Sequence, residues 1–148
     1  YRGLKLRAPT SFCVGATLDL GRGTEREARL LHRKRTAGAE FFMTQPVHDS
    51  GEPQRFLDAY EAATGSKLEG HVFWGLQVFD ANGVVFGDVP QWIKDDLAKG
   101  RPGTDIALQV LHDLVEHGFR MIYLVPPILK GGARDYEAAQ RVIEALRG

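Results

Sequence analysis

The chain has 148 residues, which is enough for one domain with a hydrophobic core. Its 19 basic and 19 acidic residues balance, so no overall charge attracts it to nucleic acid or to an anionic membrane. The single cysteine, Cys13, excludes an internal disulfide and a cysteine-rich metal site. We therefore expect neither nucleic acid nor membrane as a partner.

Cysteine use and the chain ends bear on location. One cysteine favours a reducing compartment, the cytoplasm, and we expect Cys13 to be a small buried hydrophobic residue within a strand. No apolar run approaches the roughly 20 residues of a membrane span. The first residues, YRGLKLRAPT, lack an initiating Met and a signal-peptide pattern, which suggests a fragment of a longer chain. The histidines are scattered without metal-ligand spacing, so no metal site is expected.

Apolar runs and amphipathic stretches alternate in the first half of the chain. Thr24 is the expected N-cap of the first helix, with Glu27 completing a capping box and Gly38 as the C-cap. The second helix should bury Phe56 and Tyr60 on one face. The predicted elements are strands at 12–18 and 40–45 and helices at 24–37 and 54–64.

The second half repeats this alternation. Asp80–Gly83 predicts a turn, after which Val84–Phe86 would fold back as a short hairpin arm. Thr104 is the expected N-cap of a helix whose buried stripe includes His117, and Ala145 should face inward in the last helix. The predicted elements are strands at 72–79 and 119–125 and helices at 91–99, 105–117 and 135–146.

The order is a strand followed by helical structure, four times. Such alternation requires right-handed crossovers and a parallel sheet, so the predicted class is α/β. Four units form a small open sheet or half of an eightfold (β/α)8 barrel, which needs about 250 residues. We favour one partial-barrel domain over 1–148, strands five to eight of a TIM barrel. No strand is followed by G-x-G-x-x-G, which weakens a nucleotide-binding Rossmann interpretation.

The end of the second strand is the candidate ligand site. Phe41–Met43 is a short apolar run typical of a strand buried on both faces, and Thr44 and Gln45 follow it before Pro46. Parallel strands open into a ligand crevice at their carboxyl ends. An uncharged amide both donates and accepts hydrogen bonds, so Gln45 suits a heterocycle or carboxamide edge. The alternative is that Gln45 satisfies backbone groups at the strand end.

One segment carries a resemblance to a known family. Glu27–Asp49, with its A-G-A-x-F-F-M-T-Q and following Asp, resembles the sixth-strand region of methylenetetrahydrofolate reductases. Val89–Trp92, Gly103–Ile106 and Glu116–Gly118 are similar to the last two repeats of that family. The resemblance covers roughly 12–123, and the T-Q motif is its most specific part.

The resemblance implies a flavin-bearing barrel. The family reduces 5,10-methylenetetrahydrofolate to 5-methyltetrahydrofolate in one-carbon metabolism and methionine biosynthesis, with hydride passing from NAD(P)H through FAD. The family's general acid and its Asp beside the flavin ring belong to the other half of the barrel. The resemblance therefore implies no catalytic residue here, and a segment that alone is not a competent reductase.

The resemblance also assigns residues to ligands. Gln45 matches the family's substrate-contacting Gln, and Arg33 and Lys34 match a basic pair facing the FAD phosphates. Glu27 falls where the family has an acidic residue near the adenosine portion of the flavin. The alternatives are a solvated helix face for the two cations and a capping-box role for Glu27.

Three features depart from the family. The loop at 18–24 is shorter than the family's FAD-contacting loop, and the Asp80–Gly83 turn stands where the family has a helix over folate. Lys130 follows the last strand, where the family has an Arg for the folate tail, and it could bind that tail with a monodentate contact. Gln77, in an apolar strand, needs a partner if buried and is a further candidate for substrate contact.

Two other hypotheses remain open. The chain could be a non-catalytic module that self-associates into a homo-oligomer, because an open parallel sheet leaves edges and an apolar face uncovered. It could also be a barrel oxidoreductase or methyl-group enzyme with another substrate. The residues expected on the uncovered face are Phe12, Val14, Met43, Phe73 and Tyr123.

Overall fold

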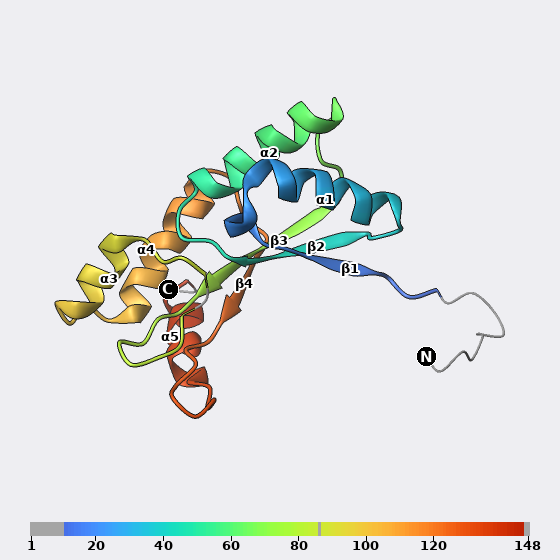
Figure 1. Ribbon diagram of the computed structural model, residues 1–148. Coiled ribbons are helices and arrows are strands. Elements are labelled where there is room, and N and C mark those ends of the chain that lie inside the picture. The colour runs from blue at the N-terminus through green and yellow to red at the C-terminus, as the bar shows by residue number, and fades with distance from the viewer. Residues whose placement is uncertain (1–10, 86, 147–148) are drawn as a thin grey trace.

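The computed structural model describes residues 11–85 and 87–146, and Figure 1 shows their arrangement. Four strands alternate with five α-helices and one short 3-10 turn. The strands are β1 (Gly15–Leu18), β2 (Phe41–Pro46), β3 (His71–Gln77) and β4 (Ile122–Val125). The helices are α1 (Thr24–Thr36), α2 (Gly51–Thr64), α3 (Gln91–Ala98), α4 (Gly103–Glu116) and α5 (Tyr136–Ala145), with the 3-10 turn η1 at Leu20–Arg22.

The sheet is parallel and its strands lie in chain order, β1-β2-β3-β4. Strand residues Leu18, Phe42 and Trp74 join one core with helix residues such as Phe56 and Leu114. The helices therefore cover one face of the sheet, with α1 and α2 side by side over it (Figure 1). A doubly wound sheet reverses its strand order and has helices on both faces, so this arrangement is half of a (β/α)8 barrel, as predicted.

The opposite face of the sheet carries aromatic side chains, and no helix within residues 11–85 and 87–146 lies above them (Figure 1). Phe41 and Phe73 pack edge to face at 6.0 Å between ring centroids. Met43, Phe73 and Tyr123 are half-buried on this face, as expected. Phe12 and Val14 are 76% and 50% exposed and precede β1. Self-association through this face stays a prediction.

The first strand is shorter than predicted. It begins at Gly15, opposite Phe41, because the ladder with β2 begins there. Cys13 therefore lies outside the sheet and is exposed, so the prediction of a buried strand cysteine is wrong. Residues 1–10 lie outside the described part of the chain.

The two predicted helix N-caps are also wrong, whereas Gly38 does end α1 with a positive φ of 104°. Gly23 is the N-cap of α1 and no side chain caps this helix end. Glu27 Oε1 instead accepts a hydrogen bond from the backbone N–H of Asp19 at 3.2 Å. Helix α4 begins at Gly103 after Pro102, so Thr104 lies within its first turn.

The second half differs from prediction in three places. His117 and Ala145 are exposed: His117 is the C-cap of α4, and Ala145 is the last residue of α5. The turn at Asp80–Gly83 forms, with Gly83 N–H donating to the Asp80 carbonyl at 3.0 Å. Val84 then forms an antiparallel bridge with Ile128 and does not fold back on β3, while Phe86 lies outside the described residues.

Gly103 provides a test of how α4 is seated. A Cβ at Gly103 would lie 1.9 Å from the Phe79 carbonyl oxygen, so Gly103→Ala must shift backbone. We expect it to lower the free energy of unfolding by about 3 kcal/mol in urea denaturation. Thr104→Ala is the matched control and should cost well under 1 kcal/mol, because Thr104 is not the helix cap. A larger loss for Thr104→Ala would contradict this helix start.

Candidate functional site

A pocket of about 300 Å³ lies at the carboxyl ends of β1 and β2. Strand carboxyl ends form the ligand-binding face of barrel proteins, so this pocket is the candidate functional site. It combines an amide, carboxylates, a guanidinium and an imidazole. The side chains that supply these groups include Gln45, His48, Glu52, Arg55 and Asp88.

A break in strand register directs Gln45 into this pocket. Met43 pairs with Phe73 and Pro46 with Gly75, so two residues of β2 oppose one residue of β3. The Gly75 N–H donates to Thr44 Oγ1 at 2.9 Å inside this break. Such bulges re-aim side chains next to ligand sites. Gln45 is consequently exposed and lines the pocket, where the sequence predicted a ligand contact.

A side chain on β4 stabilises the bulge in β2. The Tyr123 hydroxyl on β4 donates a hydrogen bond to the Thr44 carbonyl. This contact crosses β3 at Gly75, where a Cβ would lie 2.9 Å from the Tyr123 hydroxyl and 3.2 Å from the Pro46 Cα. Gly75 therefore gives the Tyr123 ring the space that the bulge needs.

Glu52 contributes an unusual carboxyl group to the pocket. It stands in the first turn of α2, where its N–H donates to Asp49 Oδ1 at 3.1 Å. Burial, and then the charge of Asp49, raise the pKa of Glu52 from 4.5 to about 7, while the His48 backbone N–H and Arg55 act in the opposite direction. At neutral pH this carboxyl group is about half protonated, so it both donates and accepts hydrogen bonds.

Two neighbouring side chains shape the pocket. The Arg55 guanidinium lies 3.8 Å from Asp49 Oδ1, above Gly51. His48 is only 4% exposed, and its ring lies against Phe79 at 5.8 Å between centroids. His48 lines this pocket and also a second hollow next to α4.

Two of the three predicted cofactor residues face each other. Glu27 is 2% exposed, and its Oε1 lies 3.6 Å from the Lys34 ammonium. Lys34 also donates to the Thr17 carbonyl of β1. This pair joins α1 to β1 and keeps Glu27 away from the pocket. Of the pair, only Lys34, about one quarter exposed, has surface that a cofactor phosphate could reach.

The third predicted cofactor residue lies next to Lys34 on the surface of α1. Arg33 is exposed and lines a shallow hollow along α1 together with Lys34, Leu30 and His32. That hollow shares no lining residue with the pocket around Gln45. The three residues therefore fit a flavin phosphate only in part, through Arg33 and the exposed portion of Lys34.

The remaining two predicted substrate residues do not meet Gln45. Gln77 is 1% exposed, and its amide donates to the Val84 carbonyl at 2.9 Å, which holds the loop after β3. Lys130 is exposed on a turn closed by the Gly132 N–H donating to the Leu129 carbonyl at 3.0 Å. Neither residue lines the pocket. Their contact with substrate stays a prediction.

Sequence reasoning missed Glu52 and Arg55. Their signal was positional, because they occupy the first two turns of the helix that follows the Gln45 strand, where barrel ligand sites gather. Within residues 11–85 and 87–146, no three potential metal-ligating side chains come together. In the same part of the chain, no helix has the length and apolar character to cross a bilayer.

Comparison with known proteins supports the fold. An uncharacterised protein from Clostridium thermocellum that binds two copies of 5-methyl-5,6,7,8-tetrahydrofolic acid is similar in structure, with a TM-score of 0.63 and 16% sequence identity. The match covers 89% of this chain and 52% of that protein, so the chain spans about half its length. No protein-family model and no curated protein matches the sequence.

The pKa of Glu52 predicts a pH dependence of stability. The folded state keeps the proton up to a pH of about 7, whereas the unfolded chain releases it near 4.5, so stability falls as pH rises through this window. Glu52→Gln should remove this fall and stabilise the protein at pH above 7 by about 1 kcal/mol, after allowance for solvent screening. Urea denaturation across this pH range measures it. Glu61→Gln, on the same helix, is the control; an equal effect there would contradict the assignment.

Proposed function

We propose that this chain is the carboxyl-terminal half of a methylenetetrahydrofolate-reductase-like barrel and binds reduced folate at the pocket around Gln45. The observation that carries this proposal is the bulge at Thr44–Gln45, which turns the amide of the T-Q motif into a pocket at the strand carboxyl ends. The structural likeness to a methyltetrahydrofolate-binding protein supports it.

The chemistry of the pocket suits a pterin. The pterin ring presents donors and acceptors along one edge, and the amide of Gln45 can pair with both kinds of group. Glu52, about half protonated at neutral pH, can donate to a ring nitrogen or accept from an amino group. Arg55, which lines the pocket 3.8 Å from Asp49 Oδ1, is a cation that can bind the carboxylates of the folate tail.

The proposal also includes FAD as a cofactor. A bound FAD would supply hydride transfer between NAD(P)H and folate. In this chain the exposed parts of Arg33 and Lys34 would contribute positive charge toward its phosphates. The protein's own contribution is to orient the folate through Gln45, so that the reacting carbon has a fixed place.

The flavin is tested by the absorbance spectrum of the natural full-length protein, recorded without oxygen before and after addition of NADH or NADPH. We expect a flavin band that one of the two nucleotides bleaches, which would also name the donor. A protein without flavin that takes up none from added FAD would contradict the reductase and leave folate binding to be tested separately.

Gln45 is tested by folate affinity. Gln45→Ala removes a hydrogen-bonding amide and should weaken 5-methyltetrahydrofolate binding by about 10-fold in calorimetry. Gln54→Ala is the matched control, because Gln54 is exposed on α2 and bonds Asp58. Unchanged affinity in Gln45→Ala, or an equal loss in Gln54→Ala, would contradict the placement of folate here.

A further inference from the structure

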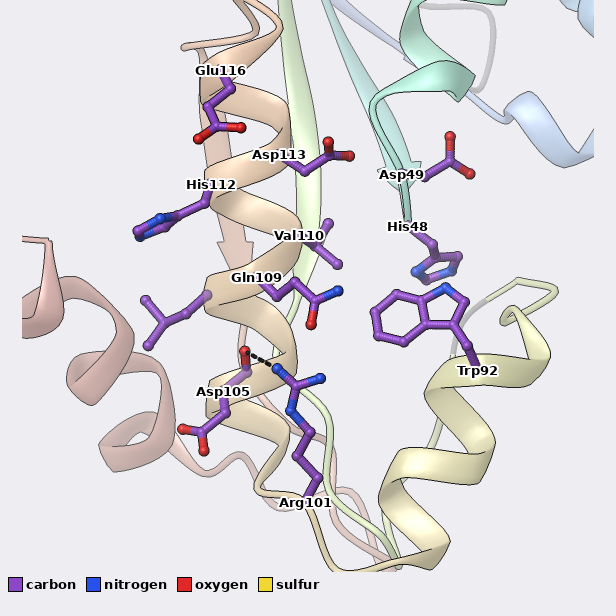
Figure 2. Close-up of a pocket in the computed structure, with 11 residues that line it drawn as sticks. His48, Asp49, Trp92, Arg101, Asp105, Gln109, Val110, His112, Asp113 and Glu116 are labelled. Atoms are coloured by element: carbon purple, nitrogen blue, oxygen red, sulfur yellow. Dashed lines mark hydrogen bonds between the residues drawn. The ribbon is translucent and has the colours of Figure 1, made fainter.

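A second and larger hollow, of about 810 Å³, lies on the other side of the β2–α2 loop. It is bounded by that loop, by α3 and by α4, as Figure 2 shows. Its volume is within the range of small-molecule sites, about 300–1,000 Å³. The Gln45 pocket and this hollow have only His48 in common among their lining residues.

One wall of this hollow is aromatic. The indole of Trp92 on α3 points into the hollow and lies next to the His48 imidazole in Figure 2. His48 is nearly fully buried and packs against Phe79, so its position is fixed. Trp92 is half-buried, which leaves part of its ring for a ligand. A planar ring stacks favourably on such a surface.

The opposite wall presents hydrogen-bonding groups from α4. Figure 2 shows Asp113 and Gln109 pointing toward the side of the hollow where Trp92 lies, whereas His112 points away. The Ser50 N–H donates to Asp113 Oδ2 at 2.9 Å, and Asp113 Oδ1 lies 3.4 Å from His117 Nδ1, so the carboxylate is fixed between the loop and α4. In Figure 2 the Gln109 amide lies nearer Trp92, and Asp113 projects from the same side of α4 toward Asp49.

The charge of the hollow restricts its ligand. Figure 2 shows Asp49 and Asp113 on the Trp92 side of α4, whereas Asp105 and Glu116 point the other way. Arg101, a cation of the lining, already binds Asp96 at 2.8 Å. This field opposes a phosphate group and favours a neutral ring that is rich in N–H donors. A ring N–H beside an exocyclic amine matches the two oxygens of one carboxylate.

We propose that this hollow is a second ligand site, which binds a flat heterocycle with a 2-amino-4-oxopyrimidine edge. The ring lies on Trp92, its N–H and amino groups donate to Asp113, and its carbonyl accepts from Gln109. Pterins and guanine share this edge. That the bound ring belongs to a pterin rests on the folate function proposed above. The existence of the site does not depend on that function.

The test is calorimetric titration of the natural full-length protein with 5-methyltetrahydrofolate, 6-methylpterin and guanosine in turn. We expect two 5-methyltetrahydrofolate molecules per chain. Asp113→Asn should weaken one of them at least 10-fold and leave the other unchanged, and Gln45→Ala should do the reverse. Asp58→Asn, an exposed carboxylate on α2, is the matched control and should change neither.

A second variant guards against misfolding. Trp92→Phe keeps an aromatic ring, so it should retain binding but lose the fluorescence quenching that ligand causes at this site, since the other tryptophan, Trp74, is buried. Guanosine binding that depends on Asp113 would support the site and name guanine as its source. One folate per chain, lost in Gln45→Ala and kept in Asp113→Asn, with no guanosine bound, would overturn this site alone. Loss of all folate binding would overturn the proposed function, and the guanosine arm would then decide the second site.

Discussion

The candidate site depends on one irregularity in the sheet, the bulge of β2 at Thr44–Gln45. A regular strand would point Gln45 along the inner face, next to Met43 and Phe73. At the bulge, the Gly75 N–H instead donates a hydrogen bond to Thr44 Oγ1, and the Tyr123 hydroxyl donates one to the Thr44 carbonyl. Each contact fixes a backbone group, the Gly75 N–H or the Thr44 carbonyl. The direction of Gln45 is therefore set by β2, β3 and β4 together and not by its own rotamer.

The buried pair of Glu27 and Lys34 shows how a motif can serve the fold. A carboxylate with 2% exposure is costly unless a cation and hydrogen bonds accompany it. Here Lys34 and the Asp19 N–H both meet Oε1, whereas Oε2 has no hydrogen-bond partner among the described residues. The Asp19 contact also places η1 directly after β1, at the mouth of the pocket. The pattern of these residues therefore has a structural explanation, the joining of α1 to β1.

The sequence predicted the four repeats well and the site only in outline. Apolar runs and amphipathic periodicity located every strand and helix to within a few residues, because the burial of side chains produces both of these sequence patterns. The N-cap predictions failed because Gly23 and Pro102 set the chain direction and left Thr24 and Thr104 inside their helices. Hydrophobic periodicity could not predict that the Gln77 amide donates a hydrogen bond to the Val84 carbonyl in the following loop. The raised pKa of Glu52 depends on burial by segments distant in sequence, so it could not be predicted either.

The two hollows depend differently on the rest of a barrel. The Gln45 pocket opens at the strand ends, beside the inner face with its half-buried aromatic residues, so other strands would contribute to its far wall. The hollow of Trp92 and Asp113 is built from one loop and two helices on the outer side, all within this segment. Because His48 borders both hollows, the β2–α2 loop, which leads into the first turn of α2 with Glu52, forms part of the wall of each.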